Sequence, residues 1–160
     1  MDALIADLLI DPSKLEIKQG RISDRYSDVH KAVLNTNNSK KECAIKYLKP
    51  SPEMFYKEVK CHASLNHEAV LKLLGCSIPT SEDKNFSIIT EFMPNDTLDR
   101  LIDKVATGES PDNWETIKAI NIFGITAGMA YIHQHDMIHR DLKPSNIFLD
   151  ENYYPKIGDF

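Results

Sequence analysis

Cysteine is scarce in this 160-residue sequence, which contains three cysteines and no Cys-x-x-Cys pair. That scarcity argues against a disulfide framework and a zinc ribbon, and it favours a reducing compartment inside the cell. Basic residues do not outnumber acidic ones either, because the formal net charge is -5. A net negative charge argues against a nucleic acid or a membrane surface as partner, so we expect neither.

Long apolar runs are also missing. No segment approaches the roughly 20 apolar residues that a membrane span needs, and two aspartates interrupt the mildly apolar first ten residues, which have no basic flank. We therefore expect no transmembrane helix and no signal peptide, and we predict a cytoplasmic protein. The hydrophobic content of 42% and the charged content of 27% are those of a globular chain with a real core.

Hydrophobic periodicity predicts a mixture of helices and strands. Helices are expected over residues 1–10, 52–65 and 114–131, with a shorter helix that Asp96 or Thr97 caps. Strands are expected at 15–33 (two around a turn), 43–47 and 86–90. The predicted helix at 114–131 contains Gly124 and Gly128 in a Gly-x-x-x-Gly pattern together with polar side chains, which favours close packing within a helical region over a membrane span.

One short stretch, His139 to Asn146, carries the most chemistry; it reads His-Arg-Asp-Leu-Lys-Pro-Ser-Asn and leads into an apolar run. It places the carboxylate of Asp141, the ammonium of Lys143 and the amide of Asn146 within one loop. Phosphoryl transfer needs a carboxylate to orient an attacking hydroxyl and accept its proton, a cation near the moving phosphoryl group, and an oxygen ligand for a metal.

This stretch resembles the catalytic loop of the eukaryotic protein kinase family. Lys143 and Pro144 are similar to the serine/threonine members, and residues 128–133 to the tyrosine-kinase-like group. The resemblance implies an α+β, two-lobed fold, in which an antiparallel sheet and one helix form the N-lobe and an incomplete helical C-lobe follows. The implied divisions are an N-terminal arm over 1–14, the N-lobe and hinge over 15–93, and a partial C-lobe over 94–160.

The resemblance also implies residues that bind ATP. Lys46, in Ala44-Ile45-Lys46, matches the lysine that holds the α- and β-phosphates, and Glu58 falls where its partner belongs. The break after residue 90 resembles the hinge between the lobes, where the backbone would bind adenine. The implied nucleotide-binding residues are Ile22, Val29, Ala44, Lys46, Glu58, Thr90, Glu91, Met93 and Phe148.

Asp159 and Phe160 match the first two residues of the Asp-Phe-Gly motif, so the resemblance implies that Asn146 and Asp159 hold Mg²⁺. It further implies that Asp141 orients the substrate hydroxyl, that Lys143 neutralises the transferring phosphoryl group, and that the partner is a protein with serine or threonine side chains. The histidines 133, 135 and 139 are not expected to bind a metal, because no cysteine or carboxylate completes a tetrahedral set.

The glycine-rich loop departs from the family pattern. Its three glycine positions are occupied by Ile22, Asp24 and Ser27, although the backbone there must come close to phosphate. Asp24 would oppose an anionic ligand by up to about 4 kcal/mol if it pointed inward at a distance of about 4 Å. Two alternatives to an active kinase therefore remain: a pseudokinase or nucleotide-binding scaffold, and an interaction protein with no nucleotide role.

The match stops at Phe160, before the activation segment and the remaining large helices of a kinase. We expect the 160 residues to be a fragment that is inactive alone. The helix that begins at Trp114 would then expose an apolar face that a partner could cover.

Overall fold

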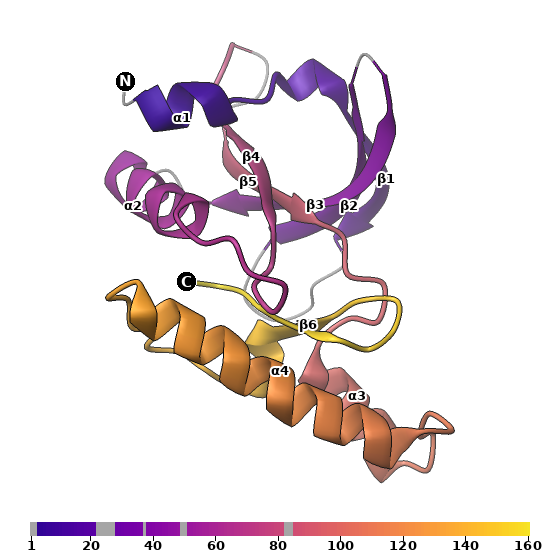
Figure 1. Ribbon diagram of the computed structural model, residues 1–160. Helices are drawn as coiled ribbons and strands as arrows, with labels where there is room; N and C mark the ends of the chain where they lie inside the picture. The colour runs from indigo at the N-terminus through magenta and orange to yellow at the C-terminus, as the bar shows by residue number, and fades with distance from the viewer. Residues whose placement is uncertain (1–2, 22–27, 37, 49–50, 82–84) are drawn as a thin grey trace. The chain divides into compact units, whose positions relative to one another are not determined.

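The computed structural model describes most of the chain, namely residues 3–21, 28–36, 38–48, 51–81 and 85–160. Ile22, Asp24 and Ser27 lie outside these residues. The chain divides into an N-terminal unit, Met1–Ser64 with Lys72–Phe92, and a C-terminal unit, Leu65–Leu71 with Met93–Phe160. Both helices and strands are present, which confirms the predicted α+β class (Figure 1).

A five-stranded antiparallel sheet in the order β1-β2-β3-β5-β4 forms most of the N-terminal unit. Burial alternates along β3, where Cys43 and Ile45 are buried while Ala44 and Lys46 are partly exposed, because successive side chains of a strand point to opposite faces. Each face can therefore bury its own set of side chains. The strands are β1 (Leu15–Arg21), β2 (Asp28–Asn35), β3 (Lys40–Leu48), β4 (Leu73–Ser77) and β5 (Phe86–Glu91).

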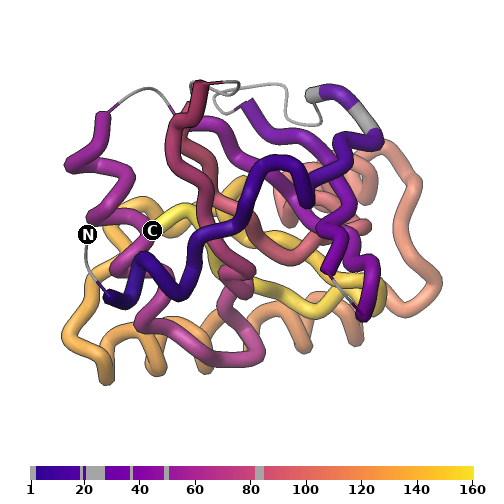
Figure 2. Tube along the Cα trace, turned by 90° about the horizontal axis from the view of Figure 1, so that it is seen from above, coloured from indigo at the N-terminus to yellow at the C-terminus, as the bar shows by residue number. Residues whose placement is uncertain are grey.

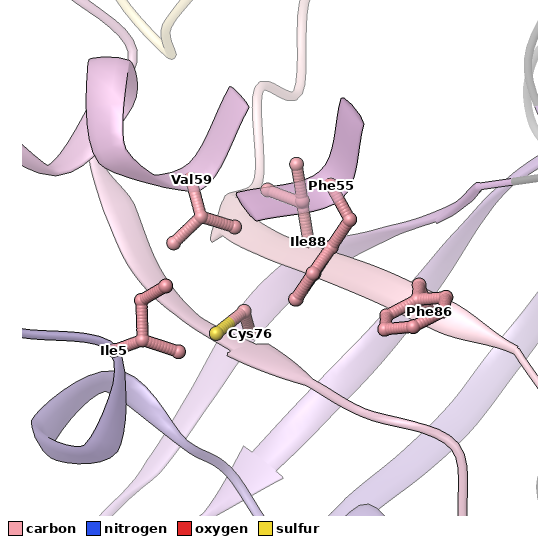
Figure 3. Close-up of a cluster of buried hydrophobic side chains, with 6 residues drawn as sticks. All are labelled: Ile5, Phe55, Val59, Cys76, Phe86 and Ile88. Atoms are coloured by element: carbon pink, nitrogen blue, oxygen red, sulfur yellow. The ribbon is translucent and has the colours of Figure 1, made fainter. Parts of the chain in front are cut away.

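Separate hydrophobic clusters form on the two faces of this sheet. One contains Ala32, Cys43, Ile45 and Ile89 from the three central strands. The other contains Phe86 and Ile88 of β5 together with side chains from the helices α1 (Ala3–Leu8) and α2 (Pro52–Ala63) (Figure 3). The two helices therefore lie on one face of the sheet.

Helix α2 has the expected signals of a short amphipathic helix. Pro52 occupies its first turn and Glu53 lies near the positive end of the helix dipole. Phe55, Val59 and His62 are buried at helical spacing, which turns one face toward the sheet. The helix ends at Ala63, two residues before the predicted end.

The segment between α1 and β1 crosses the edge strand β4 (Figure 2). The N–H of Ile10 donates to the carbonyl of Cys76 at 2.8 Å, and Leu9 forms a bridge with the same residue. Asp11 then caps a 3-10 turn, Pro12–Lys14, by accepting a hydrogen bond from the N–H of Ser13 at 2.9 Å. Helix α1 ends at Leu8, two residues before the predicted end at residue 10, because the chain leaves the helix to pair with β4.

The C-terminal unit contains two helices and a small hairpin. The long helix α4 carries the hairpin on the face that contains Gly124 and Gly128: a Cβ on them would lie 2.5 Å from Pro155 Cγ and 2.8 Å from Ile157 Cδ1. The predicted close packing of this pattern is therefore confirmed. The elements are α3 (Leu98–Ala106), α4 (Trp114–Gln134), the 3-10 turn η2 (Pro144–Asn146), β6 (Ile147–Leu149) and β7 (Pro155–Ile157).

The predicted cap of α3 is only partly right. Thr97 occupies the N-cap position, but its hydroxyl donates to the carboxylate of Asp99 and makes no side-chain cap bond to the backbone. The Thr97 hydroxyl therefore bonds to Asp99 and not to the backbone of the first turn. Among the described residues, no helix combines the length and the apolar character that crossing a membrane requires.

Candidate active site

In the N-terminal unit, the structure brings Lys46 and Glu58 together. The ammonium of Lys46, near the C-terminal end of β3, donates to the carboxylate of Glu58, in the middle of α2, at 2.9 Å. Both side chains are about three-quarters buried, at 24% and 22% exposure. Partial burial strengthens such a pair relative to a surface salt bridge, and the pair links the position of α2 to that of the lysine.

Strand register places four predicted nucleotide-binding residues on one face of the sheet. Val29 pairs with Lys46 across β2 and β3, and Ala44 pairs with Thr90 across β3 and β5. Directly opposite residues of antiparallel strands share a face, and so do residues two apart on one strand. Val29, Ala44, Lys46 and Thr90 therefore line one surface, on the same side as the α2 cluster.

Glu91 is turned to the other face and is engaged with the chain itself. Its carboxylate accepts the N–H of Lys72 at 2.8 Å, and its own N–H donates to the Lys72 carbonyl at 3.1 Å. The predicted adenine contact of Glu91 would therefore have to use its carbonyl oxygen. Met93, the other predicted hinge residue, accepts a long bond from the N–H of Asp96 at 3.4 Å.

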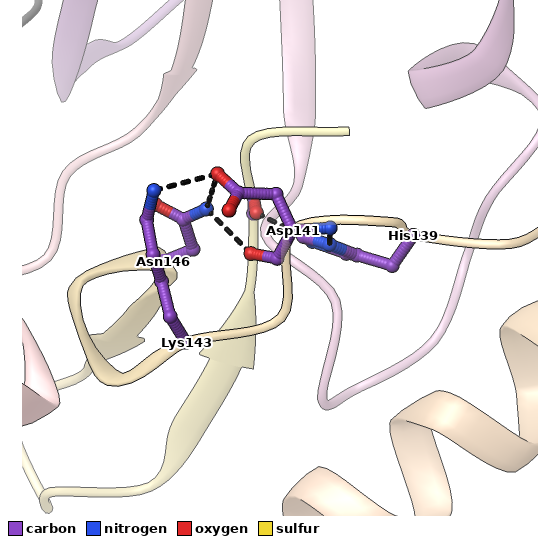
Figure 4. A network of polar contacts seen from close by, with 5 residues as sticks. His139, Asp141, Lys143 and Asn146 are labelled. Atoms are coloured by element: carbon purple, nitrogen blue, oxygen red, sulfur yellow. Dashed lines mark hydrogen bonds and ion pairs between the residues drawn. The ribbon is translucent and has the colours of Figure 1, made fainter.

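In the C-terminal unit, the polar side chains of the loop converge on Asp141 (Figure 4). The ammonium of Lys143 donates to its carboxylate at 2.6 Å. The amide nitrogen of Asn146 donates at 3.0 Å to the same oxygen atom and at 2.8 Å to the backbone carbonyl of Asp141. The three residues singled out in the sequence therefore form one hydrogen-bonded group, with the carboxylate still largely exposed.

His139 ties this loop to the segment that carries Asp159. The N–H of Asp141 donates to its Nδ1 at 3.3 Å, so Nδ1 must be an acceptor. The proton then belongs on Nε2, which donates to the carbonyl of Gly158 at 2.9 Å. The ring is buried and packs against Phe160, with centroids 5.1 Å apart.

Two residues of this region have backbone angles that residues other than glycine rarely adopt. Arg140 has a φ of 66° and Asp159 a φ of 60°, both in the left-handed region. Such conformations persist only where surrounding contacts hold them, and they gather at functional sites. The holding contacts here are the bonds of His139 and the bond from the N–H of Gly158 to the Asn146 carbonyl at 3.0 Å.

Side-chain hydrogen bonds from Lys143 and then from Asn146 hold the pKa of Asp141 below its ordinary value of 3.8. The carboxyl is therefore ionised at neutral pH. Because the pKa is depressed in the folded chain, its contribution to stability is present above the unfolded pKa and is lost as the pH falls through the lower folded pKa. Any such loss is confined to strongly acidic solution.

Replacing Lys143 with alanine should raise the pKa of Asp141 toward 3.8, because the largest contribution to the depression disappears. A carbon-13 NMR titration of the aspartate carboxyls measures this directly. Lys118→Ala is the matched control, since Lys118 is equally exposed and forms its own ion pair with Glu115 on α4 at 2.6 Å. An Asp141 that titrates at 3.8 or above in the unmodified chain would show that the network does not form in solution.

The residues of this loop fit a magnesium ion by the chemistry of their donor atoms. The amide nitrogen of Asn146 is occupied by Asp141, which leaves its amide oxygen for a cation. The N–H of Gly158 donates to the backbone carbonyl of Asn146, so the residue directly before Asp159 contacts Asn146. Amide and carboxylate oxygens are the ligands that Mg²⁺ prefers. In the part of the chain that the structure describes, no cluster of three or more histidine, cysteine or acidic side chains is suited to hold a metal.

Gly158 is a site residue that the sequence reading did not single out. A Cβ there would lie 2.8 Å from the ring of Phe148 and 3.1 Å from Leu71, so any other residue would have to displace these side chains. Gly158 also receives the hydrogen bond of His139 and donates one to Asn146. Its position directly before Asp159 and Phe160 is the sequence feature that could have identified it as a site residue. Of the predicted nucleotide-binding residues, Ile22 lies outside the described part, and Phe148 packs beside Gly158.

Comparison with known proteins gives serine/threonine kinases. A probable serine/threonine-protein kinase of Dictyostelium discoideum is 35% identical over 157 residues, which are 94% of this chain and 9% of that protein. A putative G-type lectin S-receptor-like serine/threonine-protein kinase of Arabidopsis thaliana is 39% identical over 130 residues, 75% of this chain and 14% of that protein. The PR5-like receptor kinase of the same plant is 36% identical over 129 residues, with shares of 77% and 18%.

The chain thus spans less than a fifth of the length of these curated relatives. The protein kinase domain, as a family, matches residues 23–160. This match takes in both units and confirms the resemblance that the catalytic loop indicated. The chain belongs to the protein kinase family, and its homologues are serine/threonine kinases.

Proposed function

We propose that the gene product at its native length transfers the terminal phosphoryl group of ATP to a serine or threonine hydroxyl of a protein substrate. The observation that supports this most strongly is the group formed by Asp141, Lys143 and Asn146, in which an ionised carboxylate is held by an ammonium and an amide. A group of this composition suits the orientation of a hydroxyl and the neutralisation of a phosphoryl group.

In the N-terminal unit, Lys46 would bind the α- and β-phosphates, and the ion pair with Glu58 would hold it in place. Val29, Ala44 and Thr90 share the face of the sheet that presents Lys46, and they would contact the nucleotide base. The backbone of Glu91 adds to these proposed contacts, and Met93 and Phe148, which belong to the C-terminal unit, are also proposed to contact the nucleotide.

In the C-terminal unit, Asp141 would accept a hydrogen bond from the substrate hydroxyl and then take its proton. Lys143 would balance charge on the transferring group. Asn146 and Asp159 would hold Mg²⁺, which when bound supplies positive charge to the phosphates. The low pKa of Asp141 supports a role that begins from the ionised carboxylate at neutral pH. The predicted cytoplasmic location stays part of this proposal.

A second candidate is a nucleotide-binding scaffold without turnover. Ile22, Asp24 and Ser27 at the glycine positions favour it, because bulkier residues and a negative charge hinder close approach of the backbone to phosphate. This candidate requires Mg-ATP binding through Lys46 but no phosphoryl transfer.

Thermal unfolding with and without Mg-ATP tests both candidates. Saturating Mg-ATP, at about 100 times its Kd, should stabilise the native-length protein by about 2.7 kcal/mol, and Lys46→Ala should abolish this shift. Lys57→Ala is the matched control, because this exposed lysine lies on α2 next to Glu58. Its shift should equal that of the unmodified protein.

Phosphate transfer to a protein substrate then separates the two candidates. Stabilisation together with transfer supports the kinase, and stabilisation without transfer supports the scaffold. No stabilisation by Mg-ATP in the unmodified protein would contradict both and leave an interaction protein without a nucleotide role.

A further inference from the structure

Residues 3–10, the part of the predicted N-terminal arm that is called the arm below, contact α2 and β4 at two points. Ile5 of α1 is 1% exposed and packs with Phe55 and Val59 of α2 and with Cys76 of β4. Figure 3 shows Ile5 pointing toward Val59 and Cys76. Further along, the backbone of the arm pairs with β4 through the bond from Ile10 to Cys76.

Strand β4 has a glycine, Gly75, at the point where the arm lies against it. A Cβ on Gly75 would lie 2.5 Å from the side chain of Ile10 and 2.6 Å from the carbonyl oxygen of Leu8. The second contact is with backbone, which cannot yield unless the arm itself moves. The glycine therefore accommodates the arm at a point on β4 that is remote in sequence from both Lys46 and Glu58.

The arm contacts the buried face of α2. Glu58 lies between Phe55 and Val59 in sequence, and these two side chains fix one face of α2 against Ile5 and the sheet. Chain connectivity alone does not fix the distance of α2 from the sheet, so its position also depends on the side chains packed beneath it. A gap beneath Val59 would let α2 shift, and the carboxylate of Glu58 would shift with it.

We propose that the N-terminal arm positions Glu58 for its ion pair with Lys46 by seating Ile5 between α2 and β4. Ile5 is in this sense a positioning residue, since it acts through α2. The proposal rests on the proposed function for its effect on Mg-ATP binding. Its structural content, the coupling of the arm to the ion pair, can be measured without any nucleotide.

Mass spectrometry of the native-length protein after brief chemical labelling measures both ends of this coupling. Cys76 lies beneath the arm, where burial raises the pKa of its thiol to about 11, so its alkylation reports release of the arm. Acylation of Lys46 reports loss of the ion pair, and Glu58→Gln sets the level for a fully broken pair. Cys43, buried in the cluster on the other face, is an internal control for general unfolding.

Ile5→Ala should increase labelling of both Cys76 and Lys46, by about threefold or more, while Cys43 stays unreactive. Gly75→Ala, which displaces the arm without touching Ile5, should produce the same pattern. Leu4→Ala, an exposed position of α1, should change neither. If Cys43 becomes reactive in Ile5→Ala, the milder Ile5→Val replaces it in the comparison.

Binding of Mg-ATP supplies the functional readout. Ile5→Ala should weaken it by about three- to thirtyfold, because only molecules with the ion pair formed are competent to bind. In a Glu58→Gln background, Ile5→Ala should cause no further weakening. Leu34→Ala, which loosens the other cluster, should lower the unfolding temperature but leave the affinity unchanged.

Increased alkylation of Cys76 without increased acylation of Lys46 would overturn the proposal. An unreactive Cys76 in Gly75→Ala would also overturn it. A protein that binds no Mg-ATP at all would contradict the proposed function, whereas the labelling of Lys46 would still decide whether the arm positions the ion pair. The two failures are therefore distinguishable.

Discussion

Replacing Asp141 with alanine should lower kcat of the native-length protein by about 10²- to 10⁴-fold, the contribution of a well-placed general base. The affinity for Mg-ATP should change little, since the proposed phosphate contact is Lys46. A steady-state assay with a protein substrate measures kcat, and the Mg-ATP thermal shift measures binding. A loss of turnover with unchanged binding is the expected pattern.

The geometry of the loop explains why so large an effect is expected from one carboxylate. Lys143 and Asn146 share one oxygen atom of Asp141, at 2.6 and 3.0 Å, and this fixes the orientation of the group. Arg140, with its left-handed backbone, and the buried ring of His139 fix the chain on the other side. A group held in this way is already oriented when the substrate arrives, so the rate enhancement does not require further ordering.

Asp136→Asn is the matched control for Asp141→Ala. Asp136 is an exposed carboxylate five residues upstream, and asparagine tolerates its φ of 56°. This variant removes one negative charge from the same region and should retain full activity. A loss below about tenfold in Asp141→Ala would contradict the assignment of Asp141 as the base.

The elements with strong local patterns were predictable from the sequence. Phe55 and Val59 recur at helical spacing behind a proline, which placed α2 correctly except for its last two residues. The alternation in β3 and the dense motif at 139–146 were equally clear, because both depend on neighbours within a few positions. The loop motif also suggested the polar group around Asp141 before any contact was known.

Contacts between distant segments were not predictable in the same way. The sequence around Gly75 predicts only an ordinary strand residue, although the arm packs against it in the structure. The sequence around Gly158 predicts only a turn, although Phe148 and Leu71 pack against it. The register that places Val29 opposite Lys46 also depends on strand pairing rather than on local sequence. Periodicity reports which face of an element is buried, but it does not report which partner buries that face.

Phe55 is fully buried, as its helical spacing in the sequence predicts. Truncating its side chain should therefore have the largest effect on the free energy of unfolding. Phe55→Ala should lower the free energy of unfolding of the N-terminal unit by about 3–5 kcal/mol, the usual cost of removing a buried aromatic ring. The Phe55 side chain is 0% exposed. Its ring centroid lies 4.7 Å from the ring centroid of Phe86 and 5.3 Å from that of Tyr56. These partners come from a strand and from the helix itself, so collapse around the cavity would have to move one element relative to the other.

The neighbouring residue provides the control. Met54 is 71% exposed on the same helix, and Met54→Ala should change the free energy of unfolding by no more than about 0.5 kcal/mol. Urea titration followed by pulsed thiol labelling of Cys43 and Cys76 reports on this unit specifically, since both thiols are buried in it. Fluorescence of Trp114, the single tryptophan, would instead follow the C-terminal unit. Equal effects of the two substitutions would mean that α2 is not packed on the sheet through Phe55, and the position of Glu58 would then need another explanation.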